Sequence, residues 1–111
     1  MELKDHAVQL SQLLKLLANE NRLMILCLLL EQPKTVSALA AALTDITQPA
    51  LSQHLGLLKA HGLLRSAKTG QTTTYRVADP RIARVIAVLK AEYCTDTCAA
   101  DGTEPLTEVF P

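Results

Sequence analysis

The sequence contains no Trp, one Phe and two Tyr, so aromatic residues make up only 3% of its 111 residues. Strands favour aromatic and β-branched residues, and the abundance of Leu and Ala here favours helices over most of the chain. No apolar run approaches the roughly 20 residues that span a bilayer, and the N-terminus lacks the basic start and apolar stretch of a signal peptide. We therefore expect one small, mainly helical domain in the cytoplasm, without a membrane partner.

The usual marks of an active site are also missing. The sequence has no Ser-His-Asp spacing, no Gly-rich phosphate loop and no paired carboxylates beside an apolar pocket. A binding protein is therefore expected rather than an enzyme. One possibility is a module that binds other proteins. It would be favoured if the chain did not bind duplex DNA, or if such binding did not depend on salt.

The net charge is zero, with 11 Lys and Arg against 11 Asp and Glu, but the charges are unevenly distributed. Residues 95–111 contain four acidic residues and no basic one. We expect residues 1–94 to form the folded domain and residues 95–111 to form an acidic, flexible tail. Residues 48–78 contain no Asp or Glu, and their basic residues are Lys59, Arg65, Lys68 and Arg76. A segment of one charge sign is suited to contact with phosphates.

Apolar periodicity predicts four helices, then a short β-hairpin, then a fifth helix. The helical segments are residues 3–17, 22–30, 36–43, 48–61 and 81–93, and the strands are residues 63–68 and 72–77 with a turn over 68–71. The predicted N-caps are Asn19 or Asn21, Thr35 and Thr47. Gly62 can end the helix before the first strand.

This order predicts a mainly α fold with a β-hairpin wing, in which residues 48–61 are the second helix of a helix-turn-helix and enter the major groove. The residues suited to base edges or phosphates on that helix are Gln48, Ser52, Gln53 and His54. The other predicted DNA contacts are Lys59, Arg65, Lys68, Gln71 and Arg76. The alternative is a solvated helix face beside an ordinary surface hairpin.

Three separated blocks carry a family resemblance: residues 16–26 (LLANENRLMIL), residues 49–55 (PALSQHL) and residues 58–64 (LKAHGLL). Together they resemble the ArsR/SmtB family of winged-helix repressors across residues 5–94. The resemblance implies a winged helix-turn-helix homodimer built on the first and last helices. It also implies that a small inorganic inducer releases the dimer from double-stranded operator DNA.

The metal sites familiar from that family are missing here. The segment 36–43 has no Cys and the segment 81–93 has no His, which removes the arsenic site of the type member and the intersubunit zinc site. His6, His54 and His61 are too dispersed to suggest a cluster. No resident cofactor is expected.

The remaining candidate sensor residues are Cys27, Cys94 and Cys98. Taken alone, Cys27 is typical of a core residue in a Leu-rich helix. The chain is similar, however, to the sulfide- and redox-responsive branch of the family, which has one Cys after Ile-Leu and another after a Tyr that ends the last helix. That resemblance implies that Cys27 and Cys94 become linked by a disulfide or polysulfide bridge, and that DNA is then released.

Cys98 leaves two other interpretations open. With Cys27 and Cys94 it would complete a three-thiolate site suited to As(III) or a similar thiophilic metalloid, which would then be the inducer. It can also be a resolving thiol or an exposed residue of the tail.

Overall fold

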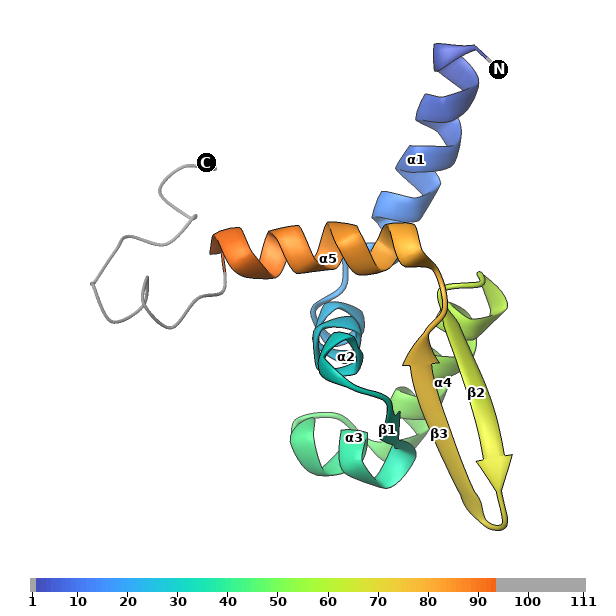
Figure 1. The fold of residues 1–111 in the computed structure, drawn as a ribbon, viewed down its shortest axis with the longest axis vertical. Helices are drawn as coiled ribbons and strands as arrows, with labels where there is room; N and C mark the ends of the chain where they lie inside the picture. The colour runs from blue at the N-terminus through green and yellow to red at the C-terminus, as the bar shows by residue number, and fades with distance from the viewer. Residues whose placement is uncertain (1, 94–111) are drawn as a thin grey trace, which may run out of the picture.

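The computed structural model describes residues 2–93 of the chain, and these form a mainly α-helical domain with a small β-sheet. The elements are α1 (Leu3–Leu17), α2 (Glu20–Glu31), β1 (Lys34–Thr35), α3 (Val36–Ala42), α4 (Gln48–Ala60), β2 (Leu64–Thr69), β3 (Thr72–Val77) and α5 (Pro80–Tyr93). Figure 1 shows the hairpin of β2 and β3 projecting from the helical body as a wing, while α1 extends from the other end. The predicted class is confirmed. Within the described range, no helix has the length and apolar character needed to cross a bilayer.

Three helix starts are fixed by side chains that the sequence predicted as caps. In each case an oxygen of the residue before the helix accepts a hydrogen bond from a backbone N–H in the first turn. The pairs are Asn19 with Arg22 at 3.1 Å, Thr35 with Ala38 at 3.0 Å and Thr47 with Ala50 at 3.2 Å. Each cap satisfies one N–H that a helix start leaves without an internal partner, and it contributes about 1 kcal/mol. Asn19, rather than Asn21, is therefore the cap of α2.

The wing belongs to a three-stranded antiparallel sheet in the order β1, β3, β2. Sequence reasoning missed β1, in which Lys34 pairs with Tyr75 and Thr35 with Thr74. A strand of two residues is too short to show the alternation by which strands are identified. The pairing ties the middle of β3 to the residues directly before α3.

The hairpin turn is tighter than the predicted turn over residues 68–71. Lys68 and Thr69 continue β2, and Thr69 pairs with Thr72, so only two residues connect the strands. Gly70 has a φ of +62°, and no described residue other than glycine has a positive φ. A two-residue connection with positive φ at its first position matches the twist of the strands and requires glycine there. Gln71 therefore lies at the tip of the wing.

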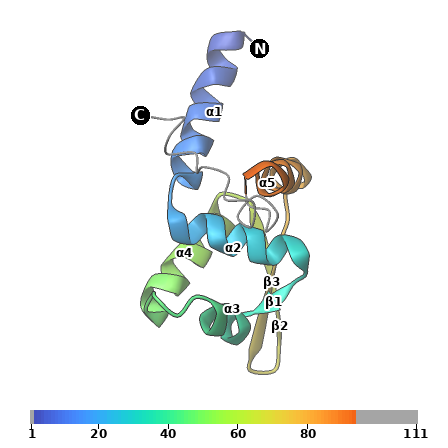
Figure 2. The ribbon, with the colours of Figure 1, turned by 90° about the vertical axis from the view of Figure 1, so that its left-hand side faces the viewer.

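The hydrophobic core is built around α2, which packs against α4, α5 and β3. Figure 2 shows α2 crossing the domain beneath α5. The largest fully buried side chains are Ile25, Leu26, Leu39, Leu51, Leu55, Leu58 and Ile86. Leu57, the remaining Leu of α4, is 39% exposed. At 100° per residue, position 57 is turned away from the line of positions 51, 55 and 58.

The first helix packs against the core through its C-terminal part, where Leu13 and Leu16 are partly buried. Leu17 is the buried residue of α1, whereas Leu10 and Leu14 are 55% and 60% exposed. The last helix also presents exposed apolar side chains, of which Val88 is 60% exposed. Two helices at one end of the domain thus carry apolar faces that the protomer itself does not cover (Figure 1).

Candidate nucleic-acid interface and thiol site

The predicted base-reading residues lie along the surface of α4. Three Leu residues fix the buried side of this helix, and Gln48, Ser52 and Gln53 are all exposed. Gln48 and Ser52 are four positions apart and are therefore neighbours on one side of the helix. These side chains are uncharged donors and acceptors, which suits contact with base edges.

Lys59 connects α4 to the wing. Its Nζ donates a hydrogen bond to Oγ of Ser66 in β2, with a distance of 2.8 Å. Both side chains belong to the part of the domain that lacks carboxylates, because residues 48–78 contain no Asp or Glu. The predicted phosphate contact Lys59 is thus held on the side of α4 that faces β2.

The other predicted basic contacts are divided between the two faces of the wing. Arg65 and Arg76 are directly opposite one another in the β2–β3 pairing, and both are exposed. Lys68 is three positions from Arg65, so it lies on the opposite face of the sheet, on which Ser66 also lies. Like charges placed directly across two strands repel each other in the free protein. A bound anion would remove that repulsion.

The tip of the wing and the start of α4 line one shallow cleft. This cleft of about 220 Å³ includes Gln48 and Gln71, together with Thr35, Ser37 and Thr72. The structure therefore brings together two predicted contacts that are far apart in sequence. It adds Thr35 and Ser37, which sequence reasoning had not assigned to the interface because their place beside the wing depends on the missed strand β1.

His54 lies on the other flank of α4 and faces α2. It is half-buried, and its pKa is lowered from 6.5, first by burial and then by the positive charge of Arg22. Its imidazole is therefore neutral at pH 7. The Nε of Arg22 is buried and has no hydrogen-bond partner among the described residues. Sequence reasoning missed Arg22, which only the packing of α2 against α4 brings to His54.

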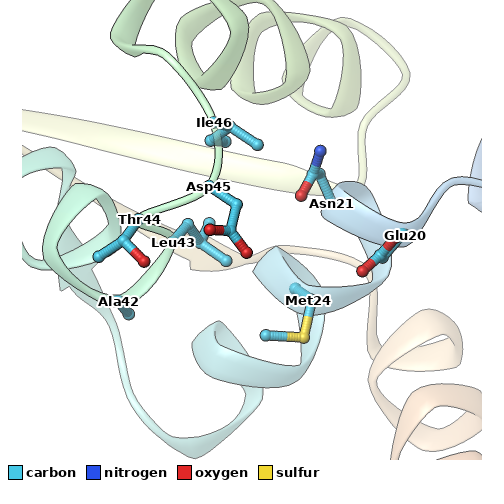
Figure 3. A pocket seen from close by; sticks show the side chains of 8 residues that line it. All are labelled: Glu20, Asn21, Met24, Ala42, Leu43, Thr44, Asp45 and Ile46. Carbon is cyan, nitrogen blue, oxygen red and sulfur yellow. The ribbon is translucent and has the colours of Figure 1, made fainter.

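A second cavity lies between α2 and the turn that joins α3 to α4. It has a volume of about 350 Å³ and is lined in part by Glu20, Asn21, Met24 and Asp45 (Figure 3). Two carboxylates make this cavity unsuited to a phosphate. Among the described residues, no three His, Cys, Asp or Glu side chains are grouped so as to hold a metal ion.

Cys27 is the candidate sensor residue that the structure describes. It lies in α2, where it is partly buried and packs against the core. One turn further along, Glu31 accepts a hydrogen bond from Nζ of Lys90 in α5, at 2.9 Å. Cys94 and Cys98 lie outside the described residues, and Cys94 follows directly after Tyr93, where α5 ends.

Comparison with known proteins places this arrangement in a family. The model of the arsR family of bacterial regulatory proteins matches residues 19–66. The transcriptional activator HlyU of Vibrio cholerae is 38% identical over 84% of this chain and 85% of HlyU. The biofilm growth-associated repressor of Agrobacterium fabrum is also 38% identical, over 83% of this chain and 78% of the repressor. The chain belongs to the arsR family.

Solved structures of arsR-family relatives agree with the fold. Reduced HlyU from Vibrio cholerae superposes with a TM-score of 0.78 at 36% identity, covering 84% of this chain and 97% of that one. A homodimeric winged helix-turn-helix DNA-binding domain from Mycobacterium bovis gives a TM-score of 0.68 at 32% identity, covering 82% and 85%. The winged helix-turn-helix fold is thereby confirmed, with α4 as the second helix of the motif. An arsR-family chain is a DNA-binding transcriptional regulator and not an enzyme, and homodimers are typical of this family.

Proposed function

We propose that this arsR-family regulator is a homodimeric repressor that leaves its operator when Cys27 and Cys94 become covalently linked. The contact between Lys90 and Glu31 carries the proposal, because it joins the last turn of α5 to the end of α2. Glu31 is one turn beyond Cys27, and Cys94 is four residues beyond Lys90. Each of the two thiols is therefore four residues along the chain from one partner of this contact.

In this proposal α4 lies in the major groove and the wing lies along the adjacent backbone. Gln48, Ser52 and Gln53 contact base edges, which discriminate sequence. Phosphates are contacted by the basic side chains of Lys59, Arg65, Lys68 and Arg76. These contacts set the affinity for DNA and its dependence on salt. His54 and Gln71 complete the interface, one on the α2 side of α4 and the other at the tip of the wing.

The exposed apolar faces of α1 and α5 form the dimer interface. A cleft of about 420 Å³ lies between the two helices and has Leu10, Leu13, Ile82 and Val85 in its lining. It is continuous with the exposed face on which Val88 lies. A second copy of the chain would cover this surface, and two-fold symmetry would then present two α4 helices to half-sites about 34 Å apart.

The inducer step is an exchange of sulfur bonds. The Cys27 thiolate attacks one sulfur of hydrogen disulfide, the S–S bond breaks, and hydrosulfide leaves; with a longer polysulfide, one of the two leaving groups is a shorter polysulfide instead. The Cys94 thiolate then attacks the Cys27 sulfur and expels a second hydrosulfide. With hydrogen disulfide, two thiols lose two electrons and two protons, and the inducer accepts both as it becomes two molecules of hydrogen sulfide.

A bond between α2 and α5 changes how α5, which belongs to the proposed dimer interface, lies against the part of the protomer that carries α4 and the wing. The two α4 helices must fit successive major grooves at the same time. A small rotation between protomers therefore moves one α4 out of register while each domain stays folded. One solved relative is described as reduced HlyU, and a proposal in which the oxidation state of the regulator matters is consistent with that description.

The direction of regulation is part of the proposal. The names of the relatives include both an activator and a repressor. We propose repression, because the reduced dimer occupies the operator until the inducer acts. Deletion of the chain should raise transcription from its own operator in a reporter strain, and a fall in transcription would assign it as an activator.

The test is the affinity of the reduced protein for its own upstream DNA during titration with a polysulfide or with arsenite. Polysulfide should release the DNA, and mass spectrometry should find a crosslink between Cys27 and Cys94. Cys27→Ser and Cys94→Ser should each bind DNA when reduced and should fail to release it. Cys98→Ser is the matched control and should still respond. Release by arsenite with an adduct on all three thiols would overturn the disulfide mechanism in favour of metalloid sensing.

A further inference from the structure

Gly56 occupies an exposed position in the interior of α4, where glycine is the least favourable residue apart from proline. Glycine in a helix loses more chain entropy on folding than alanine does. Two features commonly require glycine in spite of this loss: a positive φ, or another part of the chain that leaves no space for a Cβ.

Neither requirement applies at Gly56. Only Gly62, with φ +80°, and Gly70, with φ +62°, have positive φ among the glycines of the described range. A Cβ built on Gly56 meets no heavy atom within 4 Å. The isolated protomer would therefore accept alanine at this position, and its helix would be more stable for it.

The surroundings of Gly56 indicate what approaches it. It lies one turn after Ser52 and one turn before Lys59, on the side of α4 that leads toward the wing. Lys59 is held on this side by its hydrogen bond to Ser66. Residues 48–78 contain no Asp or Glu, so neither α4 nor the wing places a carboxylate beside Gly56, which suits an anionic partner.

We infer that Gly56 is the point at which α4 comes closest to operator DNA, and that a Cβ here would collide with the sugar–phosphate backbone of the groove wall. This inference rests on the proposed function. The start of the second helix of a helix-turn-helix contacts base edges, so a residue one turn further along faces the wall of the groove. Contact with the groove wall does not depend on base sequence.

The test compares Gly56→Ala and Gly56→Met with the wild-type protein. At equal protomer concentration, both variants should melt at or above the wild-type temperature. Their affinity for operator DNA at fixed salt should fall by about tenfold or more, with the larger loss for Gly56→Met. Affinity for an unrelated duplex should fall by the same factor, because a phosphate-wall contact acts on all sequences alike.

Gly62→Ala is the matched control. Its positive φ makes alanine unfavourable, so this variant should melt below the wild-type temperature and the folded protein should keep its DNA affinity. Wild-type affinity in Gly56→Ala, or a melting temperature below wild type, would overturn the inference. Failure of the wild-type protein itself to bind DNA would instead overturn the proposed function.

Discussion

Lys90 and Glu31, which are 59 positions apart in the chain, form an ion pair with 2.9 Å between Nζ and Oε2. The pair joins the last turn of α5 to the final residue of α2. Both side chains are partly exposed, so solvent screens their attraction and the pair adds little to global stability. Its effect is positional, because it fixes how the end of α5 lies against α2.

Replacement of Glu31 by Gln should therefore slow the linkage of the two thiols. We expect polysulfide to crosslink Cys27 to Cys94 several times more slowly in Glu31→Gln, because α5 loses its anchor to α2, while the melting temperature changes little. The measurement is a mass-spectrometric time course under limiting polysulfide.

Lys34→Gln supplies the control for that variant. The charge of Lys34 also acts on Glu31 and contributes to lowering its pKa, but the hydrogen bond to Glu31 comes from Lys90. Crosslinking in Lys34→Gln should keep the wild-type rate. Equal rates in Glu31→Gln and wild type would show that the ion pair does not position the thiols.

His54 should make the fold sensitive to pH just below neutrality. Its pKa is lowered from 6.5 in the folded protein, by burial and by Arg22. The unfolded chain therefore binds a proton at higher pH than the folded chain does, and stability falls as the pH drops below about 6.5. The measurement is the melting temperature of the protein between pH 8 and pH 5.

Arg22→Gln isolates the electrostatic part of this effect. Without the nearby positive charge, the pKa of His54 should rise toward its usual value, which NMR titration of the imidazole detects. Burial is the larger cause and stays in place, so the rise should be partial. Arg22→Lys keeps the charge and should keep the lowered pKa. No difference between Gln and Lys at this position would contradict the assignment.

Arg65 and Arg76 should raise the affinity for DNA while their mutual repulsion lowers the stability of the wing in the unbound protein. Arg76→Gln removes one of two like charges that lie directly across β2 and β3, so the unbound protein should be unchanged or slightly more stable. DNA affinity should fall by a similar factor on all sequences, and the slope of log affinity against log salt should decrease by about 1. Gln53→Ala should instead change the preferred base sequence with little effect on the salt slope.

The dimer interface can be tested at Val88. Val88→Arg places a charge on the exposed face of α5, and we expect a largely monomeric protein with strongly reduced operator affinity. Sedimentation velocity and DNA titration report the two effects. Met24→Arg is the control, because Met24 is also an exposed apolar residue but lies on α2 beside the carboxylates of Glu20 and Asp45. A dimeric Val88→Arg protein would place the interface elsewhere.

Local features of this fold follow from short stretches of sequence. The caps Asn19, Thr35 and Thr47 act within three residues of themselves, so the residue type and the start of apolar periodicity were sufficient to predict them. The strand β1 could not be predicted in this way, because its two residues are a strand only by pairing with β3. The limits of each helix were predicted to within two residues, because caps and apolar periodicity are local features of the sequence.

The candidate site depends more on tertiary structure. Sequence reasoning selected the basic residues of the wing as one group, but the register of β2 and β3 places Lys68 and Arg65 on opposite faces. Packing of α2 against α4 brings Arg22 to His54, and packing of α2 against α5 brings Glu31 to Lys90. Such contacts between distant positions are fixed by how elements pack, and no local pattern encodes them.

The weak anchoring of α1 has a consequence for how the regulator responds to its own abundance. A lone helix of 15 residues is only marginally stable in water. Here the protomer buries Leu17 fully and Leu13 and Leu16 only in part, so the N-terminal half of α1 has little support. In the proposed dimer, α1 therefore completes its folding as it meets the partner, and assembly is coupled to folding. Below the dissociation constant of the dimer, occupancy of the operator should rise with the square of protomer concentration, so a modest change in synthesis or degradation of the chain becomes a steeper change at the promoter.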